Sequence, residues 1–178
     1  MKNKNNIIFG VISVIVIVAI VIISPMLTSN NKAEEKTTLS DQELFSKASI
    51  ESNNIKDDEK KDFYDIDVDT YLSIAHEEEK SLVLVGRNGC QYCKIAEPII
   101  QNIMYKYDLT INYVSTDYFD EESYQRFSNS NDLLKSFATP LLMVVSNDQI
   151  NDSVQGLLDT DGYMNFFTKN GFINGTEE

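Results

Sequence analysis

Side chains that bind metals or transfer protons are scarce in this sequence of 178 residues. It has a single histidine, His76, and only two cysteines, Cys90 and Cys93. A structural zinc site usually takes four ligands from Cys and His, so these three would need a carboxylate or a second chain to complete the set. No Ser-His-acid triad and no phosphate-loop pattern is present. The sequence therefore argues against a zinc site, a hydrolytic triad and a phosphate-binding loop.

Basic residues are also few. The chain has 28 Asp and Glu against 15 Lys and Arg, which gives a formal net charge of −13. Such a surface repels phosphate backbones and argues against nucleic-acid binding. The negative charge favours solubility or basic partners, and composition leaves both interpretations open.

One long apolar run contrasts with the rest of the chain. Residues 7–23, "IIFGVISVIVIVAIVII", carry no charge, and a helix of this length spans roughly 25 Å. Extension to residue 27 brings it close to the ~30 Å hydrocarbon thickness of a bilayer. Lys2 and Lys4 precede the run, which favours a cytoplasmic N-terminus at residues 1–6. We predict a single-pass membrane anchor at residues 7–27 and an extracytoplasmic C-terminal part; a cleaved signal peptide is the alternative.

The segment after the anchor has few large apolar side chains. Residues 28–62 are predicted to form a flexible acidic linker, because they cannot bury enough surface to offset the entropy of ordering. Within it, "LSDQELF" places Ser40 three residues before Glu43, the pattern of a capping box. This pattern favours a short helix at residues 41–52.

From residue 63 to residue 178 the pattern is that of a globular domain. "SLVLVG" at 81–86 is a continuous apolar run, typical of a strand buried on both faces. Asp69 is the expected cap of a helix before it, and an amphipathic helix with Ile95, Ile99 and Ile103 on one face follows the cysteines. The element order β-α-β-α-β-α-β-β-α predicts an α/β fold with a central mixed sheet and helices on both faces.

The two cysteines stand two residues apart between the buried strand and the amphipathic helix. Unpaired N–H groups and the helix dipole stabilise a thiolate at such a position, where Cys-x-x-Cys thiols have pKa values of about 3.5–7.5. We expect Cys90 to be the nucleophile, exposed at the edge of the turn, and Cys93 to resolve the mixed disulfide one turn later. Arg87 and Lys94 are expected either to add positive potential or to be solvated surface charges. A purely structural disulfide remains an alternative, although so short a loop would stabilise little.

The motif and its surroundings resemble the thioredoxin-like superfamily. Pro98 follows Cys93 by five residues, where thioredoxins carry the proline that bends the active-site helix. Downstream, "ATPLLMVV" is similar to the segment in which thioredoxins carry a cis-proline facing the cysteines, here Pro140. The resemblance covers residues 63–173.

This resemblance implies several site residues. Pro140 would be the cis-proline, and the backbone of Thr139 would pair with a bound substrate. Gln91 and Tyr92, between the cysteines, would also contact the substrate, and Gly156 would lie near the site. The redox-active disulfide Cys90–Cys93 would be the only cofactor, with no metal.

The sequence also departs from thioredoxins. Gly89 replaces the tryptophan before the first cysteine, and Gln91-Tyr92 replaces Gly-Pro. Leu84 stands where thioredoxins have a buried acid, and the segment 117–140 is longer than in compact thioredoxins. With the predicted anchor, the chain is similar to the membrane-tethered proteins of Gram-positive bacteria called bacteriocin transport accessory proteins.

These features together predict a membrane-anchored thiol–disulfide oxidoreductase outside the cytoplasm. Its partners would be exported proteins or peptides with thiols or disulfides and a membrane electron carrier, with the chain itself a monomer. The direction of electron flow stays open. The alternative is a non-catalytic thioredoxin-like module that binds an exported peptide or part of a secretion assembly.

Overall fold

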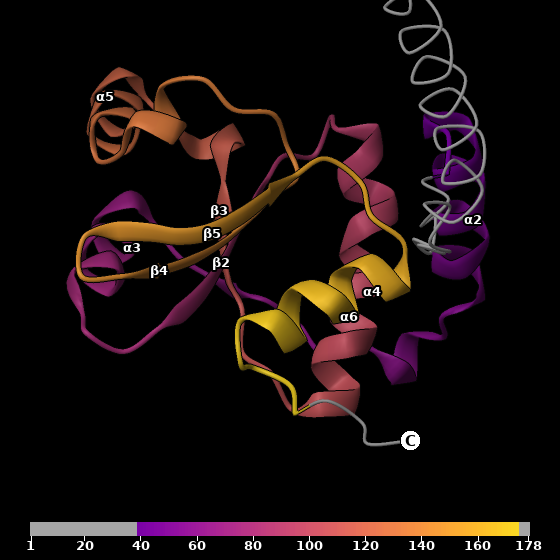
Figure 1. Cartoon of the computed structure of the whole chain (residues 1–178). Coiled ribbons are helices and arrows are strands. Elements are labelled where there is room, and N and C mark those ends of the chain that lie inside the picture. Colours follow the sequence, from indigo (N-terminus) through magenta and orange to yellow (C-terminus); the bar gives the residue numbers. More distant parts are fainter. Residues whose placement is uncertain (1–38, 175–178) are drawn as a thin grey trace, which may run out of the picture. The chain divides into compact units, whose positions relative to one another are not determined.

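A five-stranded mixed sheet forms the centre of the computed structural model, which describes residues 39–174 (Figure 1). The strand order is β1-β3-β2-β4-β5. The first three strands in this order pair in parallel, and β4 pairs antiparallel with both β2 and β5. The strands are β1 (Tyr64–Asp65), β2 (Ser81–Gly86), β3 (Asn112–Ser115), β4 (Leu141–Ser146) and β5 (Gln149–Gln155).

Helices cover both faces of this sheet. On one face α4 (Gln91–Tyr107) and α6 (Thr160–Lys169) pack together, with α2 (Asp41–Asn54) against α4. On the other face lie α3 (Val68–His76) and α5 (Glu121–Asn129). Three short 3₁₀ turns complete the described elements: η2 (Asp57–Glu59), η3 (Thr116–Tyr118) and η4 (Asp132–Lys135).

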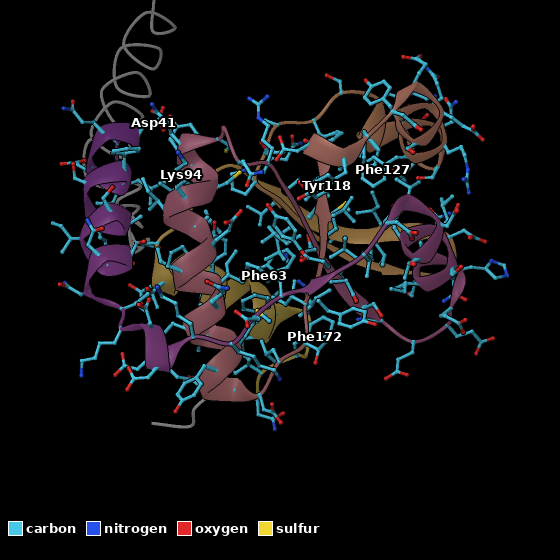
Figure 2. The ribbon with its side chains drawn as sticks, turned by 180° about the vertical axis from the view of Figure 1, so that it is seen from behind. Asp41, Phe63, Lys94, Tyr118, Phe127 and Phe172 are labelled. Carbon is cyan, nitrogen blue, oxygen red and sulfur yellow. The ribbon has the colours of Figure 1, made fainter. Side chains whose placement is uncertain are left out.

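The central strand β2 divides the core into two apolar layers. Leu82 and Leu84 belong to the layer beneath α4 and α6, and Val83 and Val85 belong to the layer beneath α3 and α5. Successive side chains of a strand point to opposite faces, so an unbroken apolar run serves both layers. Phe127 occupies the second layer, on the opposite side of the sheet from the α4 layer (Figure 2). The predicted α/β fold with a mixed central sheet is confirmed.

The compact unit begins at Leu39, whereas the sequence predicts a flexible linker up to residue 62. The capping box is present: the Ser40 side chain accepts from the Glu43 N–H, and the Glu43 carboxylate accepts from the Ser40 N–H. The resulting helix α2 buries Ala48 completely against the α4 layer. Composition missed this packing because the side chain that makes it is small and most of the helix is polar.

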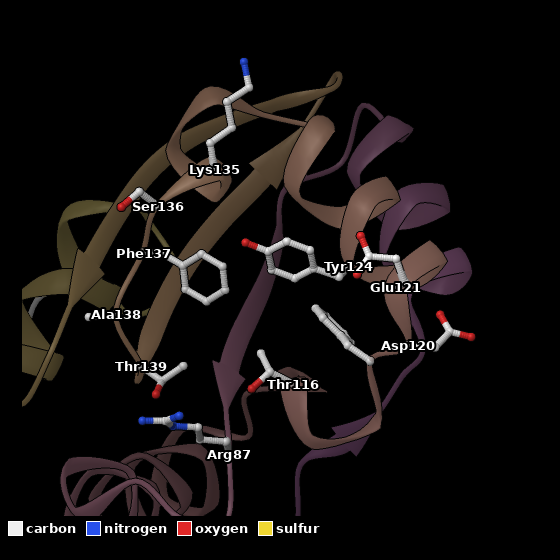
Figure 3. Close-up of a pocket in the computed structure, with 11 residues that line it drawn as sticks. Arg87, Thr116, Asp120, Glu121, Tyr124, Lys135, Ser136, Phe137, Ala138 and Thr139 are labelled. Carbon is white, nitrogen blue, oxygen red and sulfur yellow. The ribbon is translucent and has the colours of Figure 1, made fainter.

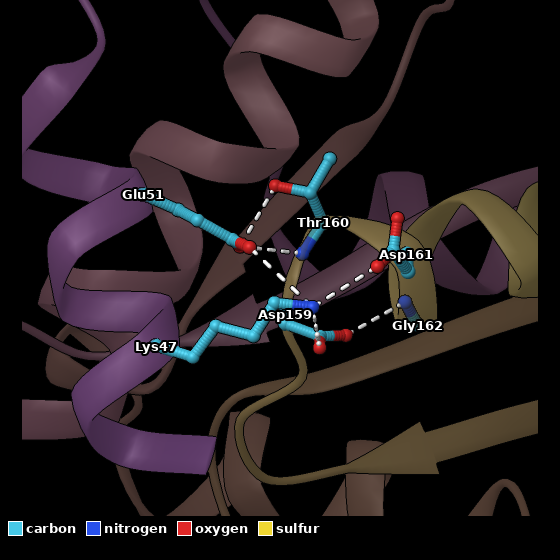
Figure 4. A network of polar contacts seen from close by, with 6 residues as sticks. All are labelled: Lys47, Glu51, Asp159, Thr160, Asp161 and Gly162. Carbon is cyan, nitrogen blue, oxygen red and sulfur yellow. Dashed lines mark hydrogen bonds and ion pairs between the residues drawn. The ribbon is translucent and has the colours of Figure 1, made fainter. Parts of the chain in front are cut away.

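Polar side chains join α2 to the first turn of α6 (Figure 4). Lys47 Nζ lies 2.7 Å from Asp159 Oδ2 and 3.0 Å from Asp161 Oδ2. Glu51 Oε2 accepts from both the N–H and the hydroxyl of Thr160, at 2.8 and 2.9 Å. The carboxylate of Glu51 therefore satisfies an N–H that α6 leaves without a helical partner, from a helix more than 100 residues earlier.

The N-cap of helix α3 lies two residues earlier than expected. Asp67, rather than Asp69, is the N-cap, and its carboxylate accepts from the Thr70 N–H at 2.8 Å. Asp69 lies in the first turn, where it pairs with Arg126 of α5. The sequence offers two aspartates at this spacing, and the extended backbone of Asp67 decides between them.

The predicted anchor at residues 7–27 and the cytoplasmic segment 1–6 lie outside the described residues. Between Leu39 and Ile173 the chain forms no helix that is long and apolar enough to cross a bilayer.

Candidate active site

The two cysteines lie where β2 leads into α4. Cys90 is the N-cap of α4, with extended backbone angles, and its Sγ accepts from the Cys93 N–H at 3.0 Å. Ser, Thr, Asp or Asn oxygens usually fill this position. A sulfur here therefore receives one of the N–H groups that the first helical turn leaves unpaired.

The environment of Cys90 favours its thiolate. Burial by itself raises the pKa of this thiol, but hydrogen bonds from the Cys93 thiol, the Thr139 side chain and the N–H groups of Cys93 and Tyr92 outweigh burial. The pKa of Cys90 therefore lies below its ordinary value. The expected exposure is not found, because only 6% of Cys90 is exposed. The side chain of Cys90 is therefore largely covered by its neighbours.

Cys93 lies one turn into α4 and has the opposite tendency. It is 1% exposed, and burial followed by the adjacent Cys90 raises its pKa to about 12. Both cysteines are free thiols in this structure. The two pKa shifts of opposite sign distinguish a thiol that is easily ionised from one that must be deprotonated to react.

The cis-proline loop faces Cys90. The Thr139–Pro140 peptide bond is cis, and the Cys90 thiol donates to the Thr139 carbonyl at 3.3 Å. Gly156 follows β5 with a φ of +87° and donates its N–H to the Pro140 carbonyl at 2.8 Å. The structure thus brings Thr139, Pro140 and Gly156 together beside the cysteine pair, although 49 residues separate Cys90 from Thr139.

The remaining sequence-derived residues surround this centre. Gln91 and Tyr92 are exposed in the first turn of α4, and the Tyr92 ring packs edge-on against Phe45 of α2, with centroids 5.9 Å apart. Pro98 lies within α4, which continues unbroken to Tyr107. Arg87 is exposed before Cys90, as is Lys94 after it.

A carboxylate–phenol pair near the cysteines was not predicted. Glu97 lies one helical turn after Cys93, and the Tyr113 hydroxyl donates to Glu97 Oε1 at 2.9 Å. Burial raises the pKa of Glu97, although the bond from Tyr113 opposes the shift. The pKa of Tyr113 is also raised, first by burial, then by Glu97, and further by the charge of Cys93. Glu97 is thus a partly buried carboxylate on the cysteine side of α4.

Close packing holds this pair in place. A Cβ built on Gly86 would lie 2.3 Å from the Tyr113 hydroxyl oxygen, so glycine at the end of β2 leaves room for the ring. The sequence contains a signal for Glu97, because it shares a helix face with Cys93 and Ile100 at spacings of four and three residues. A carboxylate on that apolar face needs a buried partner.

The zinc alternative gains no support from this geometry. His76 lies at the end of α3, and its Nδ1 is 3.0 Å from Asp148 Oδ2 in the β4–β5 turn, at the opposite end of β4 from Pro140. Over residues 39–174 no group of three His, Cys, Asp or Glu side chains is placed to hold a metal ion.

A mixed sheet of this order, with Cys-x-x-Cys at a helix N-terminus beside a cis-proline, defines a thioredoxin-like protein. The structure is similar to that of thioredoxin f2 from Chlamydomonas reinhardtii, with a TM-score of 0.51 and 14% identity, covering 64% of this chain and 100% of that one. Thioredoxin Mala s 13 of Malassezia sympodialis gives a TM-score of 0.49 at 17% identity, covering 61% and 90%. At these identities the likeness to thioredoxin f2 shows the fold alone.

The sequence identifies the family more narrowly. Residues 31–154 match the family described as "TraF: F plasmid transfer operon protein", and the chain belongs to this family. The match includes α2, so it begins before the thioredoxin-like resemblance at residue 63. A search of curated proteins found no match.

Proposed function

We propose that this protein is a thiol–disulfide oxidoreductase in which Cys90 attacks and Cys93 resolves. The observation that carries the proposal is the contrast between the two sulfurs. Cys90 accepts an N–H of α4 and has a lowered pKa, whereas buried Cys93 has a pKa raised to about 12. Such a pair separates the two steps of exchange between two thiols.

The reaction conserves electrons and protons in two steps. In the reducing direction the Cys90 thiolate attacks one sulfur of a partner disulfide, and the other partner sulfur leaves as a thiolate and takes up a proton. Cys93 then loses its proton and attacks Cys90 Sγ, which breaks the mixed disulfide and releases the second partner thiol. Two electrons pass from the cysteine pair to the partner, and the reverse sequence oxidises a partner dithiol.

The second step needs a base, because Cys93 is protonated at neutral pH. Glu97 is the nearest candidate along α4, and Tyr113 holds its carboxylate by the 2.9 Å hydrogen bond. In its ionised form Glu97 accepts the Cys93 proton, directly or through water. The raised pKa of Glu97 brings its proton affinity closer to that of a thiol than an exposed carboxylate would.

We place this activity outside the cytoplasmic membrane, with residues 7–27 as the anchor. The partners are exported proteins with thiols or disulfides, the redox disulfide Cys90–Cys93 is the only cofactor, and the protein acts as a monomer. The apolar run and the preceding Lys2 and Lys4 support this location. Anchoring raises the local concentration of the domain near translocated chains and membrane electron carriers.

A second candidate function is a binding module in a transfer or secretion assembly, with the thiols incidental. The family description, which refers to a plasmid transfer operon, favours it. The two candidates differ in what happens to a partner at Cys90.

The test is a trapping experiment with Cys93→Ala. We expect this variant to accumulate mixed disulfides with exported proteins in cells, because nothing resolves the bond to Cys90. The double variant Cys90→Ala with Cys93→Ala is the matched control and should trap nothing. A Cys93→Ala protein that traps no partner, together with full cellular function of Cys90→Ala, would establish the binding module instead. The reduction potential then sets direction: near −120 mV indicates an oxidant and near −270 mV a reductant.

A further inference from the structure

A cavity of about 830 Å³ adjoins the cis-proline loop. One wall is the loop itself, from Lys135 to Thr139, and Arg87 lies at the end of the cavity beside Thr139 (Figure 3). The Thr139 carbonyl contacts Cys90 Sγ at 3.3 Å, so this wall of the cavity reaches the reactive sulfur. A partner bound at Cys90 therefore lies next to the cavity.

The opposite wall comes from the segment between β3 and η4. Tyr124 faces Phe137 across the cavity (Figure 3). Phe119 also lines the cavity, and these three rings define what we call the aromatic pocket. Phe119 and Phe137 both rest on buried Phe127, with ring centroids 5.2 and 5.9 Å from it. Tyr124 is 43% exposed. An aromatic side chain entering the pocket would gain ring contacts and lose exposed surface.

Charge at the rim does not select a partner. Arg87 and Lys135 supply positive groups, and Asp120 and Glu121 supply negative ones. The formal charges cancel, so shape and apolar contact decide what the pocket binds.

The backbone beside the pocket lies outside the strands of the sheet and has N–H groups available to a partner. The Ala138 N–H donates to Gln155 Oε1 at 2.7 Å, on the side of β5. Within residues 39–174, the N–H groups of Phe137 and Thr139 have no partner. Alternate N–H groups of an extended segment point the same way, so these two can receive carbonyls of one added strand.

We propose that the aromatic pocket binds a large aromatic side chain of the partner polypeptide, two residues from the partner's cysteine. The partner segment is extended and pairs with Phe137 and Thr139, which places its cysteine at Cys90 and its aromatic ring between Phe137 and Tyr124. Residues two apart on a strand share a face, which fixes this spacing. The inference rests on the proposed function and names the class of substrate: unfolded or extended chains with an aromatic residue close to a cysteine.

The test compares two symmetrical peptide disulfides as substrates of the reduced full chain. One contains Phe-Gly-Cys-Gly-Phe, with Phe on both sides so that strand direction does not matter, and the other has Ala in place of both Phe. We expect the Phe peptide to be reduced ~10-fold faster, because the pocket covers part of one ring. Tyr124→Ala should reduce this preference to less than ~3-fold.

Two controls make the result decisive. Tyr118→Ala removes an 83% exposed aromatic side chain from the same segment between β3 and η4 but outside the pocket, and should leave the preference intact. A small non-peptide disulfide should react equally with wild type and Tyr124→Ala, which shows that the thiols and fold are unaffected. If this small disulfide reacts but the peptides react equally, or Tyr118→Ala matters as much as Tyr124→Ala, the pocket assignment is wrong. If no disulfide reacts, the proposed oxidoreductase function fails as well.

Discussion

The two faces of the sheet differ in how much helix covers them, and we call the more heavily covered α4 face the deep face and the α5 face the shallow face. On the α4 face, α4 with 17 residues packs beside α6 with 10, and the 14-residue α2 adds another layer against α4. On the α5 face, α3 and α5 have nine residues each and η4 has four. The cysteines begin the longest helix of the deep face, and the aromatic pocket opens on the shallow one.

This difference shows how one fold can keep its chemistry constant and vary what it binds. Thiol–disulfide exchange requires the Cys90 sulfur, the first turn of α4 and the cis-proline loop to keep fixed relative positions, which a well-packed helix provides. Recognition requires an open surface, which short helices and 3₁₀ turns leave between them. If this division holds, damage to the shallow face should spare the intrinsic reactivity of Cys90.

The largest expected effect comes from Phe127, which is fully buried and touches Tyr71, Phe119 and Phe137. Phe127→Ala should lower the free energy of unfolding by about 3–5 kcal/mol, through lost burial and a cavity. Denaturant unfolding of the full chain measures this loss. Phe127→Leu, with a smaller loss, keeps enough folded protein for kinetics.

Kinetics of Phe127→Leu then tests the division between the faces. The preference for the Phe peptide should fall, because Phe119 and Phe137 lose their support, while the rate with a small disulfide should change by less than ~2-fold. A parallel fall in both rates would show that the two faces act as one unit.

Glu97→Gln is expected to slow the exchange reaction and to leave binding in the aromatic pocket unchanged. The amide keeps the shape and can still accept from Tyr113, but it takes no proton, so the resolving step should slow by ~10²-fold at pH 7. Release of a peptide thiol from a preformed mixed disulfide at Cys90 measures this step. Glu78→Gln, at an exposed carboxylate after α3, is the control and should have no effect.

The pH dependence of the resolving rate shows whether Glu97 acts as a base or only as a structural group. In the wild type the resolving rate should rise as Glu97 ionises, at a pH above the usual carboxyl range, and then level off. In Glu97→Gln it should keep rising toward the pKa of Cys93, about 12. Because the folded pKa of Glu97 is raised, its stabilising contribution is full below its unfolded pKa and is lost as pH rises through the folded value. A variant that only shifts stability, with an unchanged rate profile, would rule out the base role.

The sequence predicted the parts of the site that depend on local pattern. Cys90 and Cys93 were located by a buried strand before them and an amphipathic helix after them, and Pro140 by the resemblance of "ATPLLMVV" to the cis-proline segment of thioredoxins. These features involve neighbours in the chain, so periodicity and motif suffice to find them. The β4–β5 turn also follows a local preference, since Asn147 and Asp148 adopt the left-handed conformation that such residues favour.

The features that were missed depend on contacts between distant segments. Glu97 stands on the apolar face of α4, which signals a buried partner, but only the fold identifies that partner as Tyr113 of β3. Helix α2 is mostly polar, and its attachment rests on Ala48 and on Glu51, whose partner Thr160 lies 109 residues later. The pairing of such residues has no local signal, because a buried alanine or a distant partner changes neither composition nor period.

A smaller effect is expected from the attachment of α2. Glu51→Ala leaves the Thr160 N–H without its acceptor, and should lower the free energy of unfolding by about 1 kcal/mol. Glu51→Gln should lose roughly half as much, because an amide oxygen can still accept but carries no charge. Hydrogen exchange should show faster opening of α2 in Glu51→Ala, with α5 unchanged. Equal acceleration in α5 would contradict the independence of the two faces.

The smallest effect is expected at His76, in the contact between α3 and the β4–β5 turn. Its bond to Asp148 raises the pKa of His76 above the ordinary value of about 6.5. A raised folded pKa gives a contribution that is full below the unfolded pKa and disappears as pH rises through the folded one. His76→Gln should therefore lower the melting temperature slightly at pH 5 and leave it unchanged at pH 8.5, as thermal melts at the two pH values can show. The difference stays small because both side chains are exposed, and because the N–H groups of Asn147 and Asp148 still donate to the carbonyls of Glu77 and Ala75, each at 2.7 Å. A larger loss at pH 8.5 than at pH 5 would mean that His76 supports the turn through packing rather than through its charge.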